Sequence, residues 1–482
     1  MENTHALLIC LKEFNLLRNY ALVLATIIYA CLVCAMCFSL LIPRQPTLRD
    51  ATRLWARIAL LSFGGPAAQI ALMHRMIVDE RKWVSEQRFL HALNYCMLLP
   101  GPEAQQLAVY LGWMTHGARG GVIAGGLFVL PGALVLFALS AVYALYGRSS
   151  IVAGAFFGLK AAALAIVAQA LARIAARTLK SIEPRAIASA AFAALFFFHV
   201  PFPLVVLAAG AYGLLRALAA PPAAPVDAAP EEATDDAPHL RPAPGESLKA
   251  AGLWLTLWLS PTLLCAALLG PDHVFARIGF FFSRLALTTF GGAYAALAYV
   301  AQDAVERQHW LAPGEMLDGL GMAETTPGPL VIVLQFVGFM AGWRDSGAMA
   351  PLLAGALGGF LASWATFTPS FLWVLVGAPY IERLRDNAAL TGALSAIMAA
   401  VVGVIFNLAL WFAIHTLFAH TQTADAFGLA VELPVLASAN IGALTLSAGA
   451  ALALVRFNAG AAATLGGCAL LAIVATFFGA GG

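Results

Sequence analysis

The chain has 482 residues, of which 61% are hydrophobic and 11% charged, and its mean hydropathy is +0.84. Soluble domains carry roughly 25% charged and 45–50% apolar residues, so this composition is typical of a membrane protein. The net charge of +2, without a basic tract interleaved with aromatic residues, excludes a nucleic-acid partner.

The first apolar run is Tyr20–Ile42, which is about one membrane span long. It is too long for the apolar region of a signal sequence, and no clear small-residue cleavage site follows it. We therefore assign residues 1–47 to an N-terminal extension with one extra apolar segment. Cys31, Cys34 and Cys37 lie in this run at a spacing that resembles a metal or redox motif. No histidine or second cysteine pair supports that function, so we interpret them as small apolar residues of a helix.

A set of landmarks then occurs twice, always 227 residues apart. The copies are Arg57 and Arg284, Phe63-Gly64-Gly65 and Phe290-Gly291-Gly292, Trp83 and Trp310, and Pro100-Gly101-Pro102 and Pro327-Gly328-Pro329. In so apolar a chain, glycines and prolines at fixed offsets indicate a duplicated membrane unit whose broken helices form a central site.

The two units are joined by a segment of different composition. Residues 221–249 contain seven prolines, six acidic and two basic residues, so they cannot bury enough apolar surface to fold alone. We expect a first repeat over 48–220, a disordered linker over 221–249 and a second repeat over 250–482.

Basic residues are distributed unequally between the two units. The first unit carries one basic cluster before the first Pro-Gly-Pro and another after the apolar run Ile151–Leu171: Arg75, Arg81, Lys82 and Arg88, then Arg173, Arg177, Lys180 and Arg185. The matching stretch 302–315 keeps one basic residue, Arg307, and 401–421 has none. Because lysine and arginine collect on the cytoplasmic side, the two units are expected to have opposite orientations.

The same bias predicts how the first broken segment runs. Both basic clusters are cytoplasmic if an even number of crossings separates them, and Gly121–Tyr146 and Ile151–Leu171 supply two. The segment Phe89–Met114, which Pro100-Gly101-Pro102 interrupts, must then enter the membrane and return as a re-entrant hairpin. The predicted fold is an all-α polytopic membrane protein with two inverted-topology repeats and Pro/Gly-broken helices.

The helix breaks are the first candidates for a binding site. A helix that restarts after Pro102 or Pro329 exposes unpaired N–H groups and about half a positive charge, which suits an anion. The glycine pairs allow close approach of a ligand or of another backbone. Simple kinks and small-residue helix packing are the alternatives. The predicted binding residues at the breaks are Gly64, Gly65, Gly291, Gly292, Gly101 and Gly328.

Arg57 and Arg284 are the cationic candidates, because a guanidinium stays charged and its planar fork fits an oxyanion. Arg49, Arg53 and Arg57 share one helix face, however, and could instead lie at the lipid headgroups. Arg284 has fewer such neighbours. We expect the matched pair Arg57 and Arg284 to serve the site.

Two acidic residues lie near the helix breaks, but at positions that do not match between the two repeats. Glu103 directly follows the first Pro-Gly-Pro, whereas Glu324 precedes the second by three residues. An acid at this depth is by default functional, so we assign both to proton coupling; a helix-capping role is the alternative for Glu103. Further predicted polar contacts are Gln105, Asn94, Thr325 and Thr326, with Gln69, Gln106 and His91 as additional lining and Lys160 as a counter-charge.

The stretches that carry these landmarks resemble a known family. Phe63–Pro66 through Trp83, followed by His91–Gln106, is similar to the first domain of the bacterial chromate ion transporters, and Glu315–Pro329 resembles the second domain of the long, two-domain form. The resemblance covers roughly residues 48–480. It implies efflux of chromate across the bacterial cytoplasmic membrane, energised by the proton motive force, with chromate taken as a sulfate mimic.

We therefore expect a multi-pass secondary transporter that needs no cofactor or metal, with chromate, protons and the lipid bilayer as partners; sulfate as a substrate and a homodimer are left open. A carrier of sulfate or another oxyanion is the first alternative. The second is an intramembrane enzyme that would use His91, Cys96 and Glu103. The lack of a metal-ligand spacing and the duplicated architecture argue against an enzyme.

Overall fold

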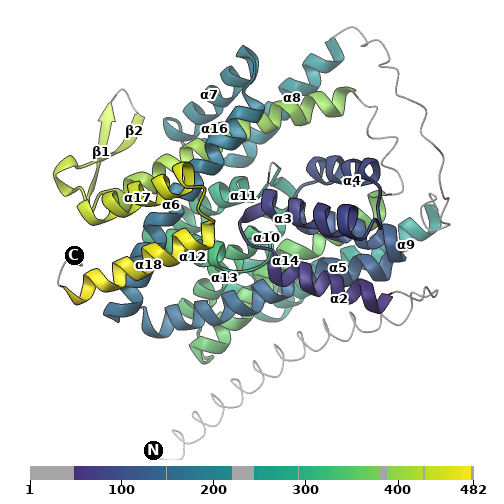
Figure 1. Ribbon diagram of the computed structural model, residues 1–482, viewed down its shortest axis with the longest axis horizontal. Coiled ribbons are helices and arrows are strands. Elements are labelled where there is room, and N and C mark those ends of the chain that lie inside the picture. Colours follow the sequence, from purple (N-terminus) through teal and green to yellow (C-terminus); the bar gives the residue numbers. More distant parts are fainter. Residues whose placement is uncertain are drawn as a thin grey trace, which may run out of the picture.

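A computed structural model describes residues 48–147, 149–219, 244–290, 292–378, 388–426 and 429–478. These residues are helical almost throughout (Figure 1), and six of their helices are long and apolar enough to cross a membrane. The all-α polytopic membrane class is thus confirmed. Residues 1–47 and most of the expected linker lie outside the described residues.

The first unit runs from α2 to α8. Its elements are α2 (Leu48–Leu61), α3 (Gly65–His74), η1 (Arg75–Glu80), α4 (Glu86–Leu98), α5 (Glu103–Tyr146), α6 (Ser150–Thr178), α7 (Ile182–Phe196) and α8 (Phe202–Ala219). The second unit runs from α9 to α18. Its elements are α9 (Pro244–Leu269), α10 (Val274–Thr288), α11 (Ala293–Val300), η3 (Ala301–Arg307), α12 (Pro313–Thr325), η4 (Leu330–Ile332), α13 (Val333–Arg344), α14 (Pro351–Gly377), α16 (Ala388–Leu417), β1 (Thr421–Ala426), β2 (Leu429–Pro434), η6 (Leu436–Ser438), α17 (Ile441–Arg456) and α18 (Ala461–Phe477).

The duplication extends to details of the backbone. The wide helical turns η1 and η3 are π-helical and begin at neighbouring offsets in the two units. Each is followed by a left-handed residue, Lys82 or His309, both with φ 54°. The tryptophan after each then donates its N–H back into the wide turn, from Trp83 to Ile77 and from Trp310 to Ala304, at 2.9 Å in both cases. These residue pairs are all 227 positions apart, so the repeated sequence folds into a repeated structure.

The long helix α5 is interrupted. His116 (φ −140°) and Gly117 (φ 62°) are not helical, and the chain doubles back there, which brings Gly112 against Gly120. Residues 103–115 therefore form a short arm that packs against α4, as a returning segment after the first Pro-Gly-Pro should. The hairpin shape agrees with the expected re-entrant segment Phe89–Met114, and its depth in the membrane stays a prediction.

The two units exchange helices. In Figure 1, α6 of the first unit lies beside α17 and α18 of the second, and α16 of the second unit lies beside α7 and α8 of the first. Glycines allow these close approaches: Gly158 of α6 meets the backbone of Cys468, and Gly403 of α16 meets that of Ala188. The exchange packs the two units closely against each other.

A short β-hairpin was not expected from the sequence. Strands β1 and β2 pair antiparallel after α16, with Thr421 opposite Pro434.

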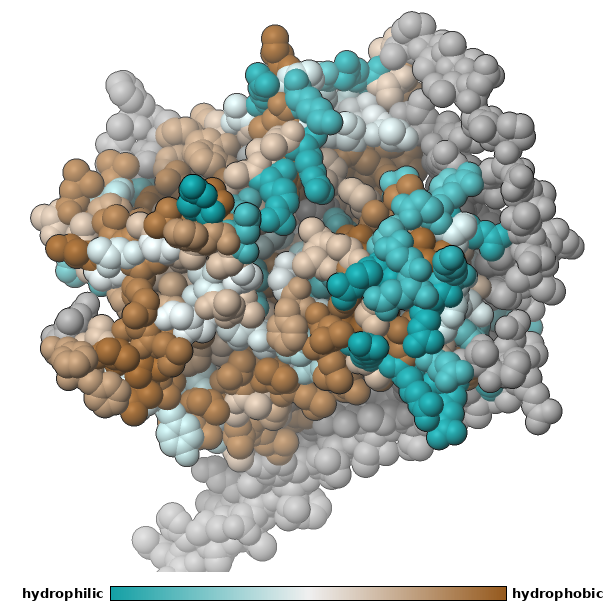
Figure 2. Space-filling model, in the orientation of Figure 1, coloured by the Kyte–Doolittle hydropathy of each residue, from teal (hydrophilic) through white to brown (hydrophobic). Residues whose placement is uncertain are grey.

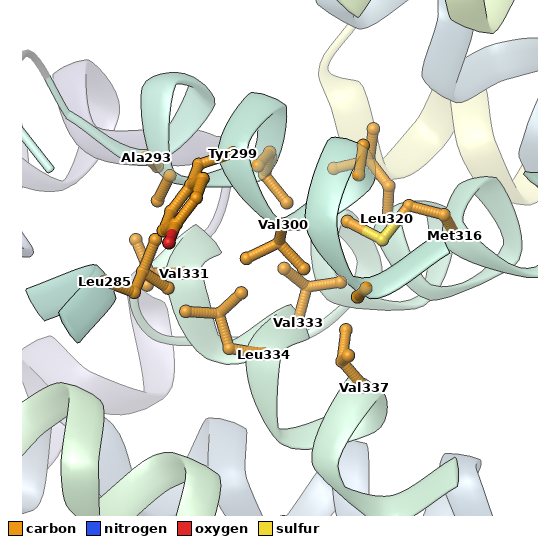
Figure 3. Close-up of a cluster of buried hydrophobic side chains, with 14 of the residues drawn as sticks. Leu285, Ala293, Tyr299, Val300, Met316, Leu320, Val331, Val333, Leu334 and Val337 are labelled. Carbon is orange, nitrogen blue, oxygen red and sulfur yellow. The ribbon is translucent and has the colours of Figure 1, made fainter. Parts of the chain in front are cut away.

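The core around the centre is aliphatic and aromatic. Figure 3 shows Leu285, Val300, Leu320 and Val333 pointing into one cluster. The face in Figure 2 also shows large apolar areas, and its hydrophilic residues are gathered into separate areas. An apolar exterior around an apolar core is what a bilayer requires.

Candidate functional site

The helix breaks of the two units bind each other through the backbone. Gly101, in the first Pro-Gly-Pro, donates its N–H to the carbonyl of Thr289 at 2.9 Å, just before the second glycine pair. Gly328, in the second Pro-Gly-Pro, donates to the carbonyl of Ser62 at 2.8 Å, just before the first glycine pair. Both donors and both acceptors are 227 residues apart. We call this reciprocal arrangement of four breaks the crossing.

The backbone at the crossing requires glycine. Gly101 has φ 112° and Gly328 has φ 101°, and Gly64, Gly65 and Gly292 also have positive φ. A residue with a β-carbon is strained in this region of φ. Gly291 belongs to the predicted set but lies outside the described residues.

A small cavity lies at the crossing and is lined by residues of both units. It has about 10 Å³, room for about one water molecule, and Gly101, Pro102, Thr289, Gly292 and Val331 contribute to its wall. The first turns of α5, α11 and η4 meet there. The wall of the cavity itself is apolar, so the helix starts border this space without exposing N–H groups into it.

The carboxylate of Glu103 already lies among these helix ends. A β-carbon at Gly292 would be 3.1 Å from Oε1 of Glu103, so the carboxylate rests against the residue that starts α11. Glu103 is also the first residue of α5. The side chain therefore places a negative group where the helix ends favour one.

Three buried glutamines bind backbone carbonyls at or near the breaks. Gln69 donates to the carbonyl of Gly328 at 2.6 Å, Gln106 to that of Pro100 at 2.7 Å, and Gln105 to that of Phe367 at 3.3 Å. In each bond the side-chain amide nitrogen donates to a backbone carbonyl. Two of these carbonyls, those of Gly328 and Pro100, lie in the helix breaks, where they have no partner within a helix. Among the described residues, no partner is found for the three amide oxygens. They remain available to accept hydrogen bonds from a bound proton donor or water.

Glu324 lies near the end of α12, three residues before the second Pro-Gly-Pro. It is buried, and the hydroxyl of Tyr294 on α11 donates to its Oε1 at 3.1 Å. The two predicted acids thus approach α11 from different units. Neither is duplicated, because Leu330 stands opposite Glu103 and Met97 opposite Glu324 in the repeat.

Arg57 and Arg284 lie apart from the cavity. Both are exposed, on α2 and α10 respectively, before the glycine pairs. A side-chain hydrogen bond joins Arg284 to Tyr299. Their role in oxyanion binding stays a prediction.

The remaining residues that were predicted as polar contacts lie at different places in the fold. Asn94 is exposed on α4. The hydroxyls of Thr325 and Thr326 donate to Met322 and Ala323 at 2.7 and 2.8 Å, closing the end of α12. Lys160 is far from the breaks in sequence and pairs with Asp318 at 3.3 Å, consistent with a counter-charge.

Several residues at the crossing were not singled out from the sequence. Ser62 and Thr289 are hydroxyl residues 227 positions apart, so the repeat spacing in the sequence indicates them. Tyr294 has no polar equivalent, since Ala67 takes its place in the first unit. Thr366 lines the cavity from α14, and Ser370 is near Gly101. The sequence feature that indicates Thr366 and Ser370 is the run Thr366–Ser370, which places three hydroxyl residues and a proline inside an apolar helix.

The family model for the chromate transporter matches residues 50–214 and 276–476, one segment in each unit. The chain belongs to the chromate transporter family. Curated relatives of this family are similar over most of their length. A chromate transport protein of Pseudomonas aeruginosa is 34% identical over 72% of this chain and 77% of its own. A chromate transport protein of Cupriavidus metallidurans is 29% identical over 74% and 81%.

Similarity extends to an archaeal relative. An uncharacterised transporter of Methanocaldococcus jannaschii is 23% identical over 77% of this chain and 85% of its own. No solved structure matches the chain. The family model leaves out α9, whereas its two matched segments contain the paired breaks of the crossing. A transporter of this family, rather than an enzyme, is the function class that these similarities support.

Proposed function

We propose that this protein exports chromate from the cytoplasm by alternating access, driven by the proton motive force. The crossing binds the oxyanion, and Glu103 and Glu324 carry protons. The two units have opposite orientations in the membrane, so that the crossing opens first to one side and then to the other.

The reciprocal hydrogen bonds of the crossing are the observation that carries this proposal. They bring two Pro-Gly-Pro breaks and two glycine breaks to one place, where three helix ends share a cavity. Irregular backbone inside a membrane is tolerated where protein or a polar cavity satisfies it. Helix ends that converge on one point favour a negatively charged ligand.

Glu103 gives the site a means of coupling. Its carboxylate lies at the helix ends, and a cavity of about 10 Å³ leaves no room beside it for a tetrahedral oxyanion. Chromate can therefore bind there if the breaks separate and the carboxylate moves away. A proton on Glu103 removes the charge that the helix ends hold, so protonation of Glu103 favours its replacement by chromate.

The arginines act before the crossing. Since Arg57 and Arg284 are exposed on the helices that lead to the glycine breaks, they attract the dianion and raise its concentration near the entrance. The helix ends then hold it. One such arginine in each unit suits a carrier that opens to both sides of the membrane.

Counterflow in proteoliposomes tests the proposed function. Vesicles loaded with unlabelled chromate should transiently accumulate radiolabelled chromate from outside, because a carrier exchanges one substrate ion for another. Unlabelled sulfate in place of internal chromate measures how far the site accepts other tetrahedral dianions. Release of a chemically altered product, or a lack of exchange by protein that is shown to be folded, would contradict a carrier.

A further inference from the structure

A second cavity lies outside the crossing, between η3, α16 and the connection from α7 to α8. Its volume is about 80 Å³, which is enough for several water molecules. Its polar lining comes from four elements of the chain: His199, Gln302, Glu306, Asn407, Trp411 and Glu432. We call it the side pocket.

The charges around the side pocket suit protons better than a dianion. Glu306 is exposed at the pocket, and Glu432 is bonded to His415 at 3.3 Å and to Thr421 at 2.7 Å. The charged and titratable groups that face Glu306 from the packed elements are His199, Asp303, Arg307 and Glu432. Arg307 is paired with Asp303 at 3.3 Å, so its positive charge is offset and the carboxylates predominate around the pocket.

The pocket points toward Glu324 along one helix. Ala298, near the end of α11, and Gln302 and Glu306, in the π-helical turn η3 that continues it, all line the pocket. Tyr294 is four residues before Ala298 on the same helix, and its hydroxyl donates to Glu324. Four residues, about 6 Å along the helix axis, therefore separate Ala298, at the floor of the side pocket, from Tyr294, whose hydroxyl binds Glu324.

We propose that the side pocket is the aqueous chamber through which protons reach Glu324. Glu306 collects protons at the mouth, and water carries them to Tyr294. The Tyr294 hydroxyl gives its proton to the Glu324 carboxylate and takes another from the water, so the tyrosine is unchanged at the end of the step. This inference rests on the proposed role of Glu324.

Two further observations support the assignment. Partial burial against the pocket wall raises the pKa of the Glu306 carboxyl above its ordinary value, while His199 and Arg307 act in the opposite direction, so the group holds a proton at a higher pH than a fully solvated glutamate. The first unit has no equivalent route, because Ala67, Arg75 and Met97 occupy the positions of Tyr294, Gln302 and Glu324. Asp79, which is exposed and matches Glu306, therefore serves as a control.

The test separates pH-driven chromate accumulation from chromate exchange at equal pH in proteoliposomes. Glu306→Gln removes the collecting carboxylate, and Ala298→Leu fills the floor. Both should slow accumulation about tenfold and leave exchange unchanged, since proton supply and not chromate binding is altered. Asp79→Asn should change neither. If both pocket variants keep wild-type accumulation while Glu324→Gln loses it, the side pocket is not the proton route and the proposed role of Glu324 stands. If Glu324→Gln also keeps it, that role fails, and this inference with it.

Labelling provides a readout that does not depend on transport. Ala298→Cys in a cysteine-free background should react about tenfold faster with a cationic than with an anionic thiol reagent of equal size, because carboxylates surround the pocket. Equal rates, or faster reaction with the anion, would contradict a proton-collecting chamber.

Discussion

In the proposed function, the single residue Glu103 joins the anion site to proton movement. Its carboxylate lies where two helix starts favour a negative charge, so we expect it to compete with the oxyanion for one place. Glu324 has a different environment, because a tyrosine hydroxyl binds it inside the protein. The two acids are therefore expected to have separate roles: Glu103 releases the site, and Glu324 receives the proton.

The competition at Glu103 makes a prediction about chromate affinity. For the wild-type protein, affinity should rise as the pH falls, because protonation removes the competing carboxylate. Glu103→Gln keeps the shape of the side chain without its charge and should bind chromate tightly with less dependence on pH. Equilibrium binding to purified protein measures both. Because chromate itself titrates identically in the two samples, an equal pH dependence in both would contradict competition by Glu103.

The exposed arginines should act through long-range attraction. Arg284→Ala is expected to raise the chromate concentration that gives half-maximal transport at low ionic strength, with less change in the maximal rate. About 1 M salt, where the screening length is about 3 Å, should remove most of the difference from wild type.

Arg53→Ala is the matched control, since Phe280 takes its place in the second unit and it forms no pair across the repeat. An effect of Arg284→Ala that persists undiminished in high salt would show that Arg284 contacts the oxyanion directly. Equal losses for Arg53→Ala and Arg57→Ala would make these arginines interfacial anchors.

At the scale of elements, the broken helices depend on glycine backbone geometry. Gly101→Ala and Gly328→Ala introduce a side chain at φ 112° and 101°, a strain of order 1–3 kcal/mol. The loss of transport should be greater for Gly328→Ala. Its β-carbon would lie 3.1 Å from the backbone oxygen of Phe128, whereas that of Gly101 would meet the flexible end of Gln106.

Gly126→Ala in α5 is the control, because nothing lies within 4 Å of its β-carbon. Chromate counterflow, normalised to folded protein in the membrane, measures all three variants. Full activity of Gly328→Ala would contradict a crossing that holds the substrate.

The broken elements could be predicted from the sequence because proline and glycine act locally. The fixed 227-residue spacing identified both Pro-Gly-Pro breaks and both glycine pairs, and the structure repeats even the left-handed residues Lys82 and His309. The partners of the breaks could not be predicted. Gly101 binds Thr289 in the other unit, and contacts so distant in sequence leave no local pattern.

The candidate site was predictable to a similar degree. Residues at the breaks lie at the crossing because the breaks themselves meet there. Arg57 and Arg284 were chosen by charge and spacing, but the direction of a helix face depends on tertiary packing, and both face outward. Tyr294 and Thr366 come from elements whose packing at the centre no repeat spacing reveals.

At the scale of the whole molecule, the exchanged helices hold two similar units around one centre. Their opposite orientation in the membrane is predicted from the basic residues, and labelling can test it. Glu80→Cys and Arg307→Cys occupy equivalent exposed positions in η1 and η3. In a cysteine-free background they should react with an impermeant reagent from opposite faces of the membrane. Reaction of both from the cytoplasmic face would replace the inverted arrangement with a parallel one.

Energised flux tests the central claim most directly. Everted membrane vesicles that contain the protein and are energised by respiration should accumulate radiolabelled chromate, and a protonophore should abolish the accumulation. Vesicles with the Glu103→Gln, Glu324→Gln double variant should exchange chromate without accumulating it. Accumulation that survives the protonophore, or that the double variant retains in full, would contradict a chromate exporter coupled to protons through the crossing.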